Sequence, residues 1–375
     1  MSLTDCFSRS YDEARGKFRA AARGAGAILA TYRNNAPMPA PADCEALGLA
    51  PVESGEPLST DVAWIGPPQA TRLIYAQSGT HGAEGFCGSG IQIAWLAGGL
   101  HRELPPDTAV LLAHAINPSG FTWLRRVTED NVDLNRNFVD HAAPYPVNAG
   151  YEALKDAICP RAWTPAARAE ADQAFAAYGA KHGPMALQAA ISSGQYSHAE
   201  GVFYGGQAAT WSNRTLIDLL RRHAANARQV AFIDLHTGLG PYGVGEIMNN
   251  HVAGEPAFAR VVDWYGEEAT SIEAGSSSSA PVHGDITLGV LHALPSAAVT
   301  AITLEYGTVP LKDVLDAVRA DNWLHAHGGL RSDEGRAIKA EIRRAFYPEA
   351  ADWEQMVVNR ADDVLQRALA GLTRV

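Results

Sequence analysis

Several histidine and glutamate residues stand where an apolar run of the sequence ends. Four such residues are His81, Glu84, His236 and Glu305. An unpaired charge buried at the end of a strand is costly, so these side chains need a partner. Imidazole and carboxylate are common ligands of catalytic zinc. A shared metal ion, with one further carboxylate beside it as a general base, would supply that partner.

The pair His81 and Glu84 lies in a glycine-rich stretch that follows the apolar run 73–76. We predict a tight loop at the C-terminal end of a strand, which is where open α/β sheets carry their sites. Glycines permit the sharp bends that would bring both side chains to one point. Taken alone, however, this pair also fits a helix-capping glutamate and a hydrogen-bonded histidine.

The segment 125–138 is polar and densely charged, with few apolar residues to anchor it. Two interpretations remain open from the residues alone. The segment is either a solvated loop, or its arginines and asparagines line an anion pocket beside the candidate metal loop.

The composition narrows the class of protein. The chain has 375 residues, 47% of them hydrophobic, and a net charge of −11. That charge argues against nucleic acid or an anionic membrane surface as the main partner. The four cysteines form no C-x-x-C pair and indicate free thiols in a reducing compartment. With no signal peptide and no membrane-length apolar window recognised, we predict a cytoplasmic protein, and the oligomeric state stays open.

The elements that must position these residues alternate between strands and helices. Apolar runs predict strands at 61–65, 72–77, 108–114, 230–236 and 299–305. The alternation predicts a three-layer α/β/α sandwich around a mixed, mostly parallel sheet. We also expect a helix over 11–32, a hairpin at the turn 66–68, and helices near 151–158, 165–178 and 213–223.

Taken together, the motifs resemble the zinc metallocarboxypeptidases of family M14, and more narrowly their bacterial DUF2817 branch. The resemblance rests on these segments, in family order: His81–Gly85, Asn117–Gly120, Arg126 with Val132–Phe138, Phe232–Thr237 and Thr303–Gly307. It implies a single catalytic domain over residues 1–375, with a helical insertion at about 139–228.

The resemblance also implies a role for each matching position. One Zn²⁺ per chain would be held by His81, Glu84 and His236. Glu305 would be the general base and later the acid. Arg126 would stabilise the oxyanion, Asn135 and Arg136 would bind a substrate carboxylate, and Asp133 would orient His81.

Some assignments remain open. Arg125, next to Arg126, is interpreted as a structural neighbour. Asp234 is either a partner of His236 or a packing residue. The segment 194–206 is expected to form a loop over the site. Packing or surface roles are the default for these residues: His114, His198, His251, His283, Gln195, Tyr196 and Tyr204.

The sequence departs from the family in two ways. Family peptidases carry a mobile tyrosine about twenty residues before the base, and the segment 281–287 has none. Either His283 or Asp285 replaces it, or nothing does. The long insertion should also reshape the substrate pocket.

These features leave three functions. The first is a zinc hydrolase that uses metal-activated water to cleave an amide (peptide) bond next to a free carboxylate. The second is a deacylase of small N-acyl amino acids, like aspartoacylase. The third is an inactive binding homologue. We therefore expect a small peptide or acyl-amino-acid substrate as the partner, and neither nucleic acid nor membrane.

Overall fold

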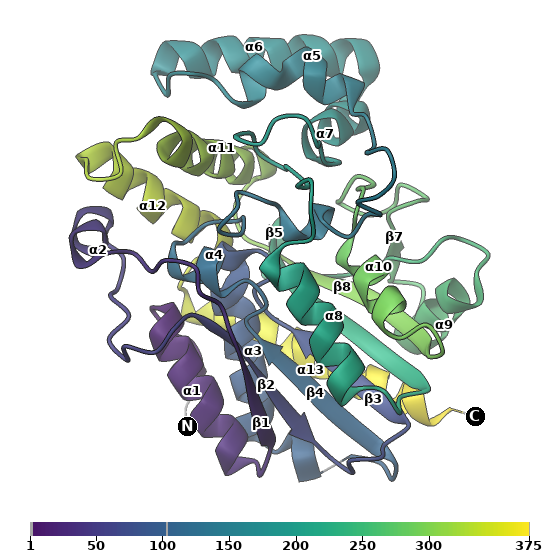
Figure 1. The fold of residues 1–375 in the computed structure, drawn as a ribbon. Helices are drawn as coiled ribbons and strands as arrows, with labels where there is room; N and C mark the ends of the chain where they lie inside the picture. Colours follow the sequence, from purple (N-terminus) through teal and green to yellow (C-terminus); the bar gives the residue numbers. More distant parts are fainter. Residues whose placement is uncertain (1–2, 103, 375) are drawn as a thin grey trace.

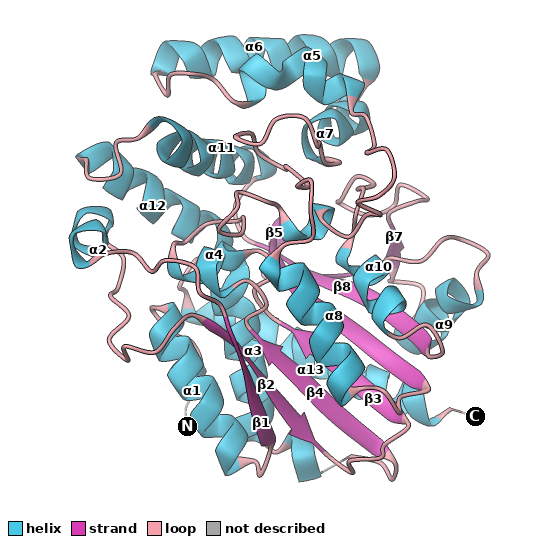
Figure 2. Ribbon diagram, viewed as in Figure 1, coloured by secondary structure: helices cyan, strands magenta, loops and turns pink. Residues whose placement is uncertain are grey.

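In the computed structural model, which describes residues 3–102 and 104–374, eight strands form one sheet (Figures 1 and 2). Their order is β1-β2-β4-β3-β5-β8-β6-β7. The strands are β1 (Ile28–Arg33), β2 (Ser59–Ile65), β3 (Arg72–Gln77), β4 (Thr108–His114), β5 (Gln229–Tyr242), β6 (Gly245–Asn249), β7 (Thr270–Ser271) and β8 (Ala298–Gly307). The centre, from β4 through β3 and β5 to β8, is parallel, and antiparallel pairs flank it.

Helices connect the strands and cover the sheet. They are α1 (Tyr11–Gly24), α2 (Pro41–Leu47), α3 (Gly85–Gly98), α4 (Pro118–Thr122), α5 (Ala149–Ile158), α6 (Pro165–His182), α7 (Pro184–Ser192), α8 (Trp211–His223), α9 (Pro256–Tyr265), α10 (Ile286–Ala293), α11 (Leu311–His327), α12 (Asp333–Phe346) and α13 (Ala351–Thr373). The short 3-10 helices are η1 (Thr4–Cys6), η2 (Gly82–Glu84), η3 (Leu100–Arg102) and η4 (Leu134–Arg136). Among the described residues, no helix is both apolar and long enough to pass through a bilayer.

Alternating side chains of the central strands build two cores, one on each face of the sheet. On β3, Ile74 belongs to the core under α1, α3 and α13, whereas Tyr75 belongs to the core under α8 and α10 (Figure 1). Successive residues of a strand point to opposite faces, so a strand covered on both sides is apolar throughout. The expected three-layer α/β/α sandwich with a mixed, mostly parallel sheet is therefore confirmed.

Two expectations about the N-terminal third were wrong. The predicted hairpin at 66–68 does not form, because β2 pairs with β1 and β4 while β3 lies between β4 and β5. The predicted helix over 11–32 ends at Gly24, and Gly26 follows with φ +74°. The alanine-rich composition favoured helix, but residues 28–33 instead pair with β2 as the edge strand.

The segment 139–228 contains four helices. Three of them match the predicted positions, and α7 was not predicted. Helices α5, α6 and α7 pack on one another beyond α11, away from the sheet (Figure 1). Helix α8 instead packs on the sheet, since Leu216 and Leu220 lie in the core under α8 and α10.

Candidate metal centre

The parallel strands β3, β5 and β8 end at one edge of the sheet, and the candidate residues lie there. His236 on β5 is directly beside Glu305 on β8. His81 lies in the loop after β3, where η2 leads into α3. A Cβ atom at Gly82 would lie 1.9 Å from the carbonyl carbon of Gly120, so only glycine allows this close approach to α4.

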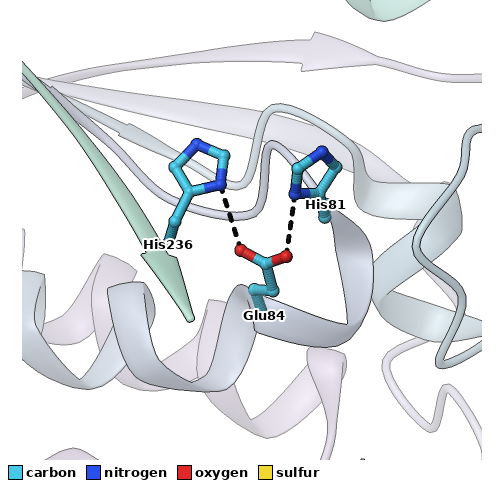
Figure 3. A group of neighbouring side chains, drawn as sticks. All are labelled: His81, Glu84 and His236. Atoms are coloured by element: carbon cyan, nitrogen blue, oxygen red, sulfur yellow. Dashed lines mark hydrogen bonds and ion pairs between the residues drawn. The ribbon is translucent and has the colours of Figure 1, made fainter. Parts of the chain in front are cut away.

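His81, Glu84 and His236 form a compact group (Figure 3). One potential ligand atom from each lies within 4.8 Å of the others. The Glu84 carboxylate lies between the two rings, with Oε1 2.8 Å from Nδ1 of His81 and Oε2 3.1 Å from Nδ1 of His236. All three side chains are buried. The structure thus brings together the three residues that were predicted from the sequence to be metal ligands.

The other nitrogen of each imidazole contacts a second carboxylate. Nε2 of His81 is 3.1 Å from Asp133, and Nε2 of His236 is 2.5 Å from Asp234. A neutral imidazole that donates through Nε2 keeps a lone pair on Nδ1, which faces the centre of the group. The structure therefore places Asp234 against His236, an arrangement that the sequence had left open.

Asp234 is itself held by two polar residues that sequence reasoning missed. Thr80 donates to its carboxylate over 2.7 Å and Gln77 over 3.1 Å. Gln77 also accepts a hydrogen bond from Tyr75. These buried polar residues at the end of an apolar strand were a signal in the sequence, because buried polar groups require partners.

The charges in this group stabilise one another. Burial opposes charge on Glu84, but His81 and His236 outweigh it and lower the pKa of its carboxyl. Burial also opposes charge on His236, yet Asp234 and Glu84 raise its pKa well above the usual value. A buried cluster of alternating sign is the environment in which a divalent cation can replace protons.

Glu305 lies beside the group without being part of it. Its side chain is 6% exposed, and Oε1 accepts a hydrogen bond of 2.9 Å from the backbone of Leu239. Burial, together with the negative charge of Glu84, raises the pKa of Glu305 to about 8. A carboxylate with a raised pKa next to candidate ligands is suited to accept and return a proton near neutral pH.

The two adjacent arginines point in different directions. Arg126 donates to Asp133 over 2.9 Å and lies 3.5 Å from Glu84. Arg125 instead bonds Asp321 and Asn131. The geometry therefore places Arg126 beside the candidate metal ligands and gives Arg125 a structural environment.

Asn135 and Arg136 already have partners within the protein. The Arg136 guanidinium donates from Nε and Nη2 to the carbonyl of Ser192, and from Nη1 to that of Asn135. The Asn135 side-chain carbonyl accepts from the backbone of Ile286, at the start of α10. Arginine carries five N–H donors, and these three hydrogen bonds use three of them.

Residues 194–206, here called the site loop, border these arginines and are fixed by many hydrogen bonds. Their carbonyl groups accept from Asn148, Asn131, Asn322, Tyr151, Asn137 and the backbone of Asp133. Within the loop, Gln195 accepts from the next turn, and Tyr196 donates to the carbonyl of Arg136 over 2.7 Å. These hydrogen bonds hold the loop in one conformation, because side chains satisfy the polar groups of its backbone.

His283 and Asp285 were the two candidates to replace the family's mobile tyrosine. His283 is exposed. Asp285 caps α10, accepting from the backbone of Thr287 over 2.7 Å. Of the remaining histidines, His114 and His251 are buried in packing positions, and His198 pairs with Glu152.

The family model described as "Protein of unknown function (DUF2817)" matches residues 7–360. A comparison with curated proteins returned no match.

Among solved structures, the chain is similar to a carboxypeptidase A from Helicoverpa armigera, with 14% identity, a TM-score of 0.45, and coverage of 93% of this chain and 76% of that one. It is also similar to a metallo-carboxypeptidase from Burkholderia cenocepacia, with 13% identity, a TM-score of 0.38, and coverage of 94% and 69%. A third is a succinylglutamate desuccinylase from Chromobacterium violaceum, with 14% identity, a TM-score of 0.34, and coverage of 87% and 75%.

Proposed function

This chain belongs to the DUF2817 family, and from the geometry of its His–Glu–His group we propose that it is a zinc-dependent hydrolase. It would cleave an amide bond next to a free carboxylate. The observation that carries the proposal is the convergence of His81, Glu84 and His236 within 4.8 Å, with Glu305 beside them.

The donor set fits zinc. Two imidazoles and one carboxylate are a common ligand set of hydrolytic zinc sites, with a fourth position left for water or substrate. Bonds of about 2.0–2.1 Å place tetrahedral ligand atoms roughly 3–4 Å apart, so a spread of up to 4.8 Å requires only small side-chain movements. Asp133 and Asp234 would hold the two rings in the ligating orientation.

The residues of the site would then each have a separate role in the reaction. Zinc, when bound, supplies Lewis-acid chemistry that lowers the pKa of a water molecule and polarises a carbonyl. Glu305 would accept the proton of the attacking water and return it to the leaving nitrogen. Arg126 would stabilise the oxyanion of the tetrahedral intermediate. Arg136 and Asn135 would bind the substrate carboxylate through their remaining donors.

A second candidate is a deacylase of small N-acyl amino acids with the same chemistry. The observation that favours it is the site loop, whose carbonyl groups are held by four asparagine side chains. A loop held in one conformation beside buried site residues suits a small substrate better than the end of a long polypeptide.

The proposal is tested with purified protein by metal analysis and a substrate screen. We expect about one zinc per chain, and hydrolysis of dipeptides or N-acyl amino acids that a chelator abolishes and zinc restores. The relative rates on the two substrate sets decide between the two candidates. Stoichiometric zinc without turnover of either set would favour a binding protein, and absence of metal affinity would refute the site.

A further inference from the structure

Phe203, in the site loop, has an unusual backbone conformation. Its φ is +55°, in the left-handed region, although it is a bulky residue. Such a conformation is an outlier for a large side chain and persists only where the surroundings impose it. The Phe203 side chain is 7% exposed. A buried aromatic ring held by a strained backbone therefore needs a reason.

Two guanidinium groups lie over the ring of Phe203. The Cζ atom of Arg126 is 5.2 Å from the ring centroid, and that of Arg136 is 5.7 Å away. Cations within about 6 Å of an aromatic face are attracted by its quadrupole. Two like charges this close to one ring repel each other, so other groups must hold them in place. Asp133 supplies part of that hold through its 2.9 Å contact with Arg126.

Hydrogen bonds on both sides of Phe203 fix where its ring lies. The Phe203 carbonyl accepts from the backbone of Gln195 over 3.1 Å. The next carbonyl, that of Tyr204, accepts from the backbone of Asp133 over 2.8 Å. The preceding carbonyl, that of Val202, accepts from the Tyr151 hydroxyl over 3.1 Å. The loop thus presents the ring to the arginines from a rigid frame.

We propose that Phe203 is a positioning residue, whose ring fixes the guanidinium groups of Arg136 and of Arg126, which contacts Glu84 of the His–Glu–His group. Under the proposed function, which this inference extends, the pair would face the two anionic parts of the reacting substrate, the developing oxyanion and the carboxylate. The positioning of the arginines itself does not depend on any turnover, so it can be tested separately.

The first test measures the arginines directly. In protein labelled with [¹⁵N]arginine, the Nε–Hε signals of Arg126 and Arg136 are assigned by their loss in Arg126→Lys and Arg136→Lys, and their exchange with water is measured. We expect slow exchange in the wild type. Phe203→Leu should speed exchange of at least one signal by about fivefold or more, because the ring face is lost.

Two further replacements at the same position separate the ring face from packing. Phe203→Tyr keeps the face and should leave exchange near the wild-type rate. Pentafluorophenylalanine at position 203 keeps the ring shape but reverses its quadrupole, so it should speed exchange as Phe203→Leu does. This replacement also keeps the inference testable if Phe203→Leu fails to fold. Wild-type exchange with the fluorinated ring would overturn the inference and leave Phe203 as a packing residue.

A matched control lies elsewhere in the same insertion. Phe175 on α6 is 9% exposed and has Arg319 over its ring at 5.1 Å. Phe175→Leu removes the same kind of contact in the outer helices, and it should leave the Arg126 and Arg136 signals unchanged. Equal changes from both variants would show a general loosening of the insertion and overturn the specific role of Phe203.

The second test measures substrate binding with an N-acyl amino acid that the wild type hydrolyses. Phe203→Leu should raise KM by about fivefold or more at unchanged zinc content, and Phe203→Tyr should restore it. Unchanged KM together with unchanged exchange overturns the inference. If the wild type hydrolyses no compound of the screen, the proposed function fails, and the exchange test still decides the role of Phe203.

Discussion

At the residue scale, each of the two histidines in the candidate site uses both of its ring nitrogens. Nδ1 of His236 faces Glu84, and Nε2 contacts Asp234. His236→Ala should therefore abolish retention of zinc, since two remaining protein ligands hold it poorly. Asp234→Asn should weaken zinc affinity by only about 10–100-fold, because it removes an orienting partner and not a ligand. Metal analysis after dialysis measures both, and one zinc per chain in His236→Ala would contradict the assignment.

Glu305 should be separable from the metal ligands. Glu305→Gln keeps size and hydrogen-bonding capacity but removes the proton acceptor. We expect unchanged zinc content and a kcat lower by about 10²–10⁴-fold, as for loss of a general base. Loss of zinc would instead make Glu305 a ligand. Near-normal kcat would mean that another group is the base.

Arg136 can be tested with paired substrates. Arg136→Ala should raise KM for a substrate with a free carboxylate and have less effect on its amide, which lacks the charge that the guanidinium binds. The three hydrogen bonds of Arg136 to backbone carbonyls make it a structural residue as well. The melting temperature is therefore measured alongside, and equal losses on both substrates would count against the carboxylate role.

At the element scale, the site loop depends on contacts from outside itself. Asn131 has φ +57° and donates from one side-chain nitrogen to the carbonyls of Ala199 and Gly201. Asn131→Gly keeps that backbone conformation accessible and removes these bonds, together with the one that Asn131 accepts from Arg125. At about 1 kcal/mol per hydrogen bond, the loop should open roughly five- to thirtyfold more often. Hydrogen exchange of residues 194–206 measures this.

A control for the site loop is Asn226, which is exposed and bonds Gln69 elsewhere on the surface. Asn226→Gly should leave exchange in residues 194–206 unchanged. If Asn131→Gly also leaves it unchanged, the loop is held by its other contacts alone.

The sequence could predict the parts of these elements that local chemistry determines. His81, His236 and Glu305 stand at the ends of apolar runs, and parallel strands bring such ends together. The pairing of β2 with β4 could not be predicted, because it depends on contacts 45 or more residues apart in the chain and not on the nearby turn. The placement of Phe203 under two arginines likewise depends on the distant partners of the site loop.

At the scale of the whole molecule, His114 at the end of β4 lies where the sheet contacts helices α1 and α3. Its ring stacks on Phe18 of α1 with centroids 4.7 Å apart, and its Nε2 is 2.8 Å from the hydroxyl of Ser89 on α3. Nδ1 is buried without a hydrogen-bond partner among the described residues. Burial lowers the pKa of His114 to about 4. This histidine joins the sheet to two helices and stays neutral in the folded state.

The contribution of His114 to the stability of the fold should consequently decrease in mild acid. In the unfolded chain a histidine binds a proton near pH 6.5, whereas folded His114 does so only near pH 4. Its contribution is thus fully present above about pH 6.5 and is lost as the pH falls toward 4. Between pH 7.5 and 5 this loss amounts to about 2 kcal/mol of unfolding free energy. Denaturant unfolding of the chelated protein at both pH values measures it, by comparison with a variant that lacks the imidazole.

His114→Gln keeps a polar side chain that can bond Ser89 but cannot titrate, so its unfolding free energy should fall by about 2 kcal/mol less over that pH interval. Titrations elsewhere cancel in this comparison, because both proteins share them. Ser89→Ala is the control, since it removes the hydrogen bond and keeps the imidazole. It should lower stability by a similar amount at both pH values and retain the wild-type slope. Equal slopes for wild type and His114→Gln would mean that His114 can be protonated in place, with water reaching the junction of α1, α3 and β4.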